Sequence, residues 1–169
     1  MAVIAEHLRM SELQRLGASA PLMQLAAGQC IHEALRDSCL GPPFYVYNGA
    51  DVPEGPTLVP LWDHGSRVCG LRAGEGELEF IEFSIELPQD FERVAGTEQG
   101  FWTTRFDFLY ECDLSDEVLR DAAEVVGFRF LERYLTAREA FEEQLGSFSA
   151  HRAWLQELVA GIDRDATSA

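Results

Sequence analysis

The sequence predicts an α+β protein in which a central antiparallel sheet of hairpins, a meander, is flanked by N-terminal and C-terminal helices. Apolar residues recur at helical spacing near both ends of the chain, whereas the middle is rich in short alternating stretches and turn signals. No β-α alternation separates the strands, which argues against a parallel sheet. A chain of 169 residues with 47% hydrophobic content is expected to form one domain over residues 1–169, with a frayed tail at 163–169.

Two helices are expected before the sheet, over residues 1–16 and 21–37. Ser11 followed by Gln14 fits a capping box, and Pro21 suits the first turn of the second helix. The run Gly41-Pro42-Pro43 then ends helical structure and starts extended chain.

The predicted sheet begins with aromatic and β-branched residues at 44–47, which are followed by the turn dipeptide Asn48-Gly49. A hairpin is expected next, with strands at 58–62 and 67–71 on either side of the turn residues 63–66. Proline cannot donate to a strand ladder, so Pro60 should lie in an edge strand or at a bulge.

The strand expected over residues 77–87 changes its alternation halfway. Acidic residues take odd positions up to Phe80 and even positions after Ile81, so an unbroken strand would place Phe80 and Glu82 on one face. A β-bulge at Phe80-Ile81 would instead gather the glutamates into a single acidic ridge. That ridge would comprise Glu77, Glu79, Glu82 and Glu86. It could bind a partner, or it could be a solvated face with interleaved arginines such as Arg105.

Residues 88–100 are expected to form a surface loop, and residues 101–112 a further strand. In that strand the aromatic residues alternate with Asp107 and Glu111, which would share the solvent face. Helical spacing returns after Asp113, with Asp113 or Ser115 as the cap and a bend near Thr136. The last helix should begin after Ser149.

The charge of the chain is strongly negative. It holds 29 acidic residues against 13 basic ones, a net of −16, and residues 71–169 carry 22 of the acids against nine arginines. Such a field disfavours nucleic acid and anionic membrane as partners, and it favours a basic protein. It would equally serve solubility alone.

No catalytic site, metal site or cofactor motif is expected. The histidines are scattered, and the four cysteines form no C-x-x-C pair, which favours free thiols in a cytoplasmic protein. These cysteines are Cys30, Cys39, Cys69 and Cys112. The adjacent Asp63-His64 pair suits turn chemistry better than acid–base catalysis. A small enzyme that uses this pair or two carboxylates, and a regulatory adaptor, remain the alternatives.

The stretch Tyr47-Asn48-Gly49-Ala50, followed by residues 58–65 (LVPLWDHG), resembles the SUKH superfamily within residues 40–112. The resemblance implies an α+β immunity protein, without catalytic residues, that binds and neutralises a secreted polymorphic toxin. Toxins that act on nucleic acid tend to be basic, so an acidic inhibitor would suit them. On this interpretation Glu77, Glu79, Glu82, Glu86, Asp107 and Glu111 are the expected partner-binding residues.

Overall fold

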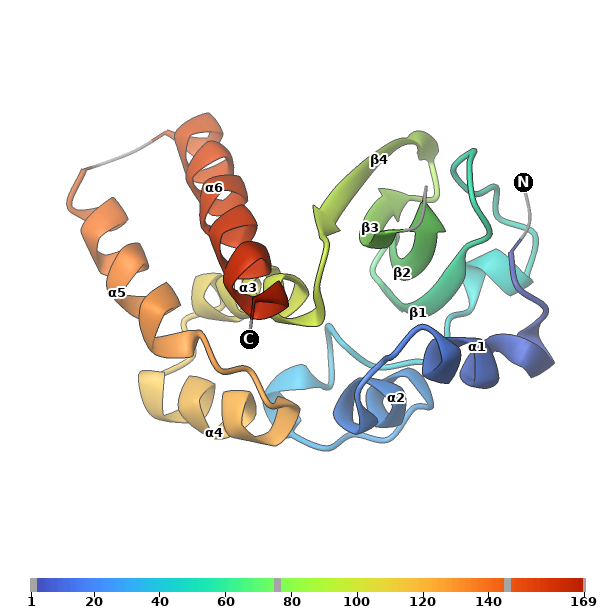
Figure 1. Cartoon of the computed structure of the whole chain (residues 1–169), viewed down its shortest axis with the longest axis horizontal. Helices are drawn as coiled ribbons and strands as arrows, with labels where there is room; N and C mark the ends of the chain where they lie inside the picture. Colours follow the sequence, from blue (N-terminus) through green and yellow to red (C-terminus); the bar gives the residue numbers. More distant parts are fainter. Residues whose placement is uncertain (1–2, 75–76, 145–146, 169) are drawn as a thin grey trace. The chain divides into compact units, whose positions relative to one another are not determined.

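The computed structural model describes residues 3–74, 77–144 and 147–168, without the side chain of Glu77. It forms two compact units, residues 1–93 and 94–169 (Figure 1). The expected single domain over residues 1–169 stays a prediction. The predicted α+β class is confirmed, because helices precede and follow one four-stranded antiparallel sheet.

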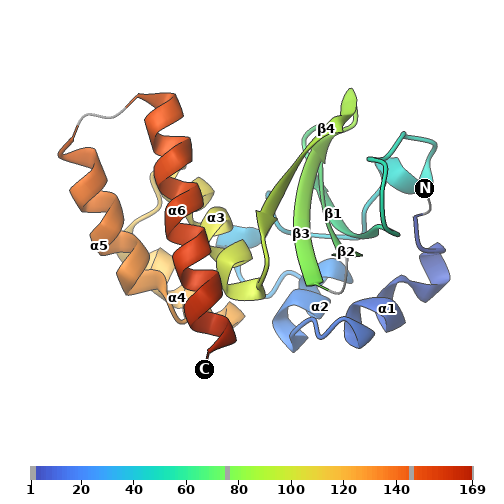
Figure 2. The ribbon, with the colours of Figure 1, turned by 45° about the horizontal axis from the view of Figure 1, so that its top comes forward.

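The sheet of the first unit has the strand order β1-β2-β3-β4, a simple meander (Figure 2). The strands are β1 (Val59–His64), β2 (Arg67–Gly74), β3 (Glu77–Ser84) and β4 (Leu87–Ala95). Before them come two short α-helices, α1 (Arg9–Arg15) and α2 (Ala20–Ala26), and the 3₁₀ turns η1 (Glu6–Leu8), η2 (Glu33–Leu35) and η3 (Tyr45–Tyr47).

The N-terminal helices are shorter than predicted. Ser19 caps α2 by accepting from the amide of Leu22, and Pro21 lies in the first turn as expected. Ser11 is not a cap, because α1 has already begun at Arg9. Gly28, with φ +88°, follows the end of α2, so the predicted helix 21–37 stops early and leaves only η2 near its end.

The predicted hairpin of β1 and β2 is confirmed, as is the position of Pro60. β1 is an edge strand, and its register with β2 shifts between Pro60 and Trp62. The strand predicted at 44–47 is wrong, since these residues form η3. The carboxylate of Asp63 explains the difference, because its Oδ2 accepts from the amides of Phe44 and Tyr45 at 2.5 and 3.0 Å and holds the chain in a turn.

The bulge predicted in β3 is also wrong. The pairing of β2 with β3 runs without a shift from Arg67↔Ser84 to Gly74↔Glu77. Phe80 and Ile81 therefore point to opposite faces, and both are 1% exposed. Ile81 belongs to the core cluster on one face with Phe83, Val68, Leu58 and Val46. The change of parity in the sequence marks a strand that is buried on both faces.

Residues 88–100 and 101–112 both differ from their predicted structures. β4 occupies most of the expected loop, and its mostly exposed or half-buried residues carry little apolar patterning. The expected strand 101–112 lies within helix α3 (Glu98–Glu111), which Thr97 caps through the amide of Gly100. Since α3 is buried over most of its circumference, its apolar residues do not trace one stripe, and chance alternation resembled a strand.

The second unit is helical and adds α4 (Asp116–Val126), α5 (Leu131–Glu142) and α6 (Phe148–Thr167) to α3. Ser115 caps α4 as predicted. The bend expected near Thr136 is absent, because α4 ends at Gly127 (φ +70°) and α5 continues through Thr136. Ser147 caps α6, and this helix continues to Thr167, so residues 163–167 are helical and the expected fraying of the tail stays a prediction. Asp163 in that segment accepts from both Gly96 N and Thr97 N, which ties α6 to the start of α3.

Arg9 is the polar centre of the first unit. Its Nη2 donates to the carbonyl of Ala26, at the last turn of α2, at 2.9 Å. Its Nη1 donates to the carbonyls of Pro60 and Leu61 at the register shift of β1. Burial lowers the pKa of Arg9, because the guanidinium loses most of its hydration.

We predict that Arg9→Met lowers the free energy of unfolding by roughly 3 kcal/mol, because several buried carbonyls lose their donor. Urea denaturation measures this change. Arg15→Met on the same helix is the matched control, since Arg15 is exposed and pairs only with Glu12. Equal losses in the two variants would contradict this role of Arg9.

Candidate functional site: a buried arginine beside a pocket

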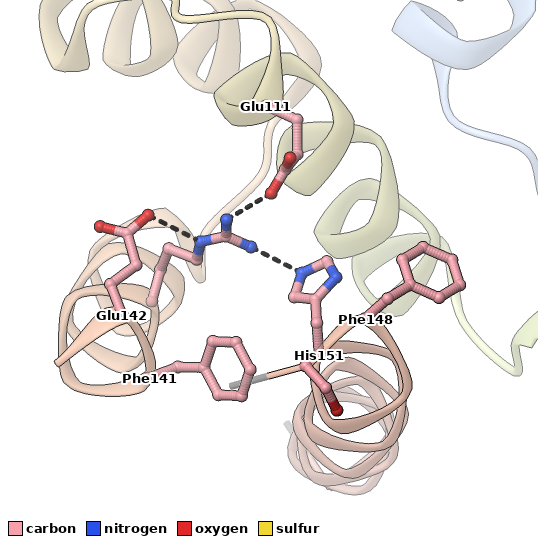
Figure 3. A pocket seen from close by; sticks show the side chains of 7 residues that line it. Glu111, Phe141, Glu142, Phe148 and His151 are labelled. Atoms are coloured by element: carbon pink, nitrogen blue, oxygen red, sulfur yellow. Dashed lines mark hydrogen bonds and ion pairs between the residues drawn. The ribbon is translucent and has the colours of Figure 1, made fainter. Parts of the chain in front are cut away.

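A pocket of about 310 Å³ lies in the second unit, where the end of α5 faces the start of α6. Its lining mixes carboxylates, a guanidinium, an imidazole and aromatic rings. These residues are Glu111, Arg138, Phe141, Glu142, Ser147, Phe148 and His151. Figure 3 shows Phe141 and Phe148 on either side of His151, with Glu111 on a separate helix across the pocket.

Arg138 reaches this position because it continues the buried stripe of α5. Leu131, Tyr134 and Leu135 precede it at spacings of three and four residues, and all four are buried. An arginine at such a position must find acceptors within the protein, since burying a charge without a partner is costly. This spacing is a signal that the sequence interpretation missed.

The guanidinium of Arg138 contacts three helices. Its Nε donates to Glu142 Oε1, one turn further along α5, at 3.2 Å. Its Nη1 donates to Asp107 Oδ1 of α3 at 3.2 Å and lies 2.6 Å from His151 Nε2 of α6. Its Nη2 donates to Glu111 Oε1, near the end of α3. Each nitrogen of the guanidinium therefore has a partner within the unit (Figure 3).

Aromatic rings complete the surroundings of Arg138. Its guanidinium carbon lies 5.0 Å from the ring centre of Tyr110 and 5.9 Å from that of Trp154, within the range of cation–π attraction. Burial alone would lower the pKa of Arg138, but the carboxylates of Glu111 and Asp107 outweigh it and raise the pKa. The arginine is therefore permanently charged.

Asp107 is the buried counterpart of Arg138, with only 5% of its surface exposed. Besides Arg138, its Oδ1 accepts from the hydroxyl of Tyr134 at 2.9 Å. Burial, followed by the charge of Asp107, raises the pKa of Tyr134. Tyr134 thus remains a neutral donor that supports the carboxylate.

The cluster has more negative than positive charge. Three carboxylates, Asp107, Glu111 and Glu142, surround the single guanidinium of Arg138. With a neutral His151 the cluster carries a net charge of about −2. The side chains of Glu111 and Glu142 are each about half exposed, at 51% and 48%, so the excess faces the pocket and solvent.

The glutamates of β3 do not form the predicted ridge. Glu82 is buried and pairs with Arg67, whereas Glu79 points to the opposite face and pairs with Arg72 and Arg93. Glu86 is exposed in the turn after β3, and the side chain of Glu77 lies outside the described residues. The interleaved arginines that were expected are therefore present, but they are Arg67, Arg72 and Arg93. Arg105 instead stacks on Phe101 in α3.

Asp107 and Glu111 come together as predicted, although on a helix and around Arg138. Four residues apart on α3, they share one side of the helix. Asp107 is too deeply buried to contact a partner directly, whereas Glu111 lines the pocket. Of the six predicted binding residues, Glu111 is the one that lines the pocket. Glu86 lies in an exposed turn of the first unit.

The other candidate sites are accounted for structurally. Asp63 and His64 are successive residues of β1, so their side chains point to opposite faces, and Asp63 binds the amides of η3. Among the described residues, no three metal-binding side chains converge. All four cysteines are free thiols, with Cys39 and Cys69 buried and Cys30 and Cys112 exposed.

Comparisons with protein-family models, with curated proteins and with solved structures found no match to this chain. The resemblance to the SUKH superfamily thus stays a prediction. In the described part of the chain, no helix combines the length and apolar character that crossing a membrane requires.

We predict that Arg138→Met lowers the free energy of unfolding by about 3 to 5 kcal/mol, because it leaves Asp107 charged and buried without its cation. Arg120→Met is the control, since among the described residues Arg120 pairs only with Asp116 and Glu132, both at the surface, and its loss should cost much less. Denaturant unfolding of both variants makes the comparison. A similar cost in the two would show that the cluster does not stabilise the unit.

The raised pKa of Tyr134 predicts a loss of stability in alkaline solution. Above about pH 10 the unfolded tyrosine ionises while the folded one stays neutral, so the free energy of unfolding falls as the pH rises. Tyr134→Phe should cost about 1 to 2 kcal/mol at neutral pH and make this alkaline decline shallower. An unchanged slope in the variant would assign the decline to other groups.

Proposed function

We propose that the protein is a binding protein for a basic partner, and that a cationic side chain of the partner enters the pocket between α5 and α6. The observation that carries the proposal is the charge imbalance at the pocket. Glu111 and Glu142 line it beside the single guanidinium of Arg138, and the buried Asp107 already pairs with that guanidinium. Because Arg138 already directs all three nitrogens at internal acceptors, the pocket offers an incoming group mainly acceptors. A cation satisfies them, whereas an anion meets carboxylates.

The aromatic lining supports the same ligand chemistry. Phe148 is 84% exposed at the pocket, an unusual position for a large apolar side chain, and Phe141 stacks on Trp154 with ring centres 4.9 Å apart. Aromatic faces beside carboxylates bind guanidinium and ammonium groups through cation–π attraction. An exposed ring next to a charged pocket is also typical of binding hot spots.

The wider charge of the chain would attract such a partner. Residues 94–169 hold 15 acids against seven arginines, and residues 1–93 hold 14 against six, so each unit has a net charge of −8. The excess of acidic residues after residue 70 therefore does not correspond to one of the two units, which are equally acidic. On α4, Glu117, Asp121 and Glu124 are exposed and form no ion pair within the described chain. Their field accelerates encounter with a basic protein.

The more specific form of the proposal is a cytoplasmic immunity protein that neutralises a basic toxin. It rests on the SUKH resemblance together with the acidic pocket. A stoichiometric inhibitor needs a complementary surface and no catalytic groups, and the cluster around Arg138 suits such a role. The enzyme alternative has no comparable support, because Asp63 is engaged with the backbone of η3.

An oligo-arginine peptide tests the binding chemistry directly. We expect Phe148→Ala to weaken its affinity about threefold to tenfold, since an exposed ring contributes to cation binding and not to the core. Phe44→Ala is the matched control, because Phe44 is 63% exposed but lies in the first unit. Isothermal titration calorimetry measures both.

The affinity should also fall steeply as the salt concentration rises, because screening weakens attraction between exposed charges. Equal effects of the two phenylalanine substitutions, or an affinity that is independent of salt, would overturn the proposed function. Protection of cells by the intact chain against the product of a neighbouring toxin gene would test the immunity role separately.

A further inference from the structure

One ring nitrogen of His151, Nε2, lies close to both a hydrogen-bond donor, Arg138, and a hydrogen-bond acceptor, Asp107. Its Nε2 is 2.6 Å from Arg138 Nη1, and also 3.2 Å from both carboxylate oxygens of Asp107. A guanidinium can only donate and a carboxylate can only accept. Nε2 can therefore satisfy one neighbour at a time, according to whether it carries a proton.

The contacts of Nε2 with Arg138 and with Asp107 require different forms of the ring, and the contact with Arg138 is the shorter. Two N–H donors cannot face each other at 2.6 Å, so Nε2 must present its lone pair to Arg138. A hydrogen bond from Arg138 to Nε2 therefore requires a neutral ring with its proton on Nδ1. In this form Nη1 donates its two hydrogens to Asp107 and His151, and the guanidinium bridges α3, α5 and α6.

A proton on Nε2 reverses the contact. The imidazolium would donate from Nε2 to Asp107, forming a charge-assisted hydrogen bond, and Nη1 of Arg138 would have to withdraw. Arg138 would keep its bonds to Glu111 and Glu142, the two carboxylates that line the pocket. The pocket would gain one positive charge and lose part of its attraction for a cation.

We propose that His151 is a proton-controlled switch for the pocket: the neutral ring, which accepts from Arg138, maintains the cation-binding form, and protonation weakens cation binding. The effect on ligand binding rests on the proposed function, whereas the change of hydrogen-bond partner does not.

The surroundings of His151 contain the groups needed for such a change. Asp107 and Glu111 belong to α3, and Arg138 and Glu142 belong to α5. Tyr134 donates to Asp107 and Tyr110 donates to Glu142, so both carboxylates stay oriented when Arg138 moves. The rings of Phe141 and Trp154 lie 5.6 Å from that of His151 and hold it between α5 and α6.

The switch can be tested without any ligand by ¹⁵N NMR of the histidine rings in the intact protein. At about pH 8 we expect His151 to be the tautomer with the proton on Nδ1, whereas most free imidazoles carry it on Nε2. Lowering the pH should shift the Asp107 carboxylate signal together with His151. A proton on Nε2 at high pH would overturn the switch, whatever the result for binding.

The binding consequence uses the same oligo-arginine peptide. We expect the affinity of the native protein to fall about tenfold or more between about pH 8 and pH 5, as one charge is added beside the pocket. His151→Gln retains an acceptor for Arg138 but cannot titrate, so its affinity should remain nearly constant. His7→Gln, which changes an exposed histidine of η1, is the control and should behave as the native protein.

The outcomes separate the two proposals. Binding that is independent of pH, with the Nδ1 tautomer confirmed, would overturn the switch and leave the cation pocket in place. No binding at any pH would contradict the proposed function, while the tautomer would still report on the geometry of His151. An equal pH dependence in native protein and His151→Gln would assign the effect to other groups.

Discussion

The second unit depends on keeping one guanidinium charged inside it. Arg138 is 8% exposed, and helices α3, α5 and α6 each provide at least one of its polar partners. Burying a charge is tolerable only when opposite charges and hydrogen bonds replace its water, so these helices must meet at this point. The replacement uses three carboxylates where one would balance the charge. The need to compensate the charge of Arg138 therefore also explains why the pocket is acidic. The excess negative charge on Glu111 and Glu142 is available to a ligand.

Much of the first unit could be predicted from sequence because its signals are local. The hairpin turn, which lies at Gly65-Ser66, the position of Pro60 and the alternation within β3 depend on neighbouring residues alone. The same alternation led to a wrong prediction in β3, because two different structures give one sequence pattern. A change of parity at Phe80-Ile81 fits a bulge or a strand with two buried faces, and the sequence contains no local signal that separates them. The prediction of a strand at residues 101–112 was wrong for a related reason, since burial of α3 on most sides removes the single apolar stripe that indicates a helix.

The candidate site was only partly predictable. Asp107 and Glu111 were singled out for their acidity, and they do lie together, but their partner Arg138 and neighbour His151 are 27 to 44 residues further along the chain. One signal was present in the sequence: an arginine continues the stripe Leu131, Tyr134, Leu135 and demands buried acceptors. Net charge, by contrast, was a poor guide to location. Glu79 and Glu82 contribute to it, yet both are paired with arginines on opposite faces of the sheet.

We propose that the acidic side chains beside Arg138, and not the glutamates of β3, provide the binding surface. Mapping of amide chemical shifts in the intact chain, titrated with an oligo-arginine peptide, tests this most directly. We expect the largest changes at Glu111, Glu142 and residues 147–151, with saturation at one peptide per chain. Changes concentrated at Glu79, Glu82 or Glu86, or spread evenly over both units, would contradict it.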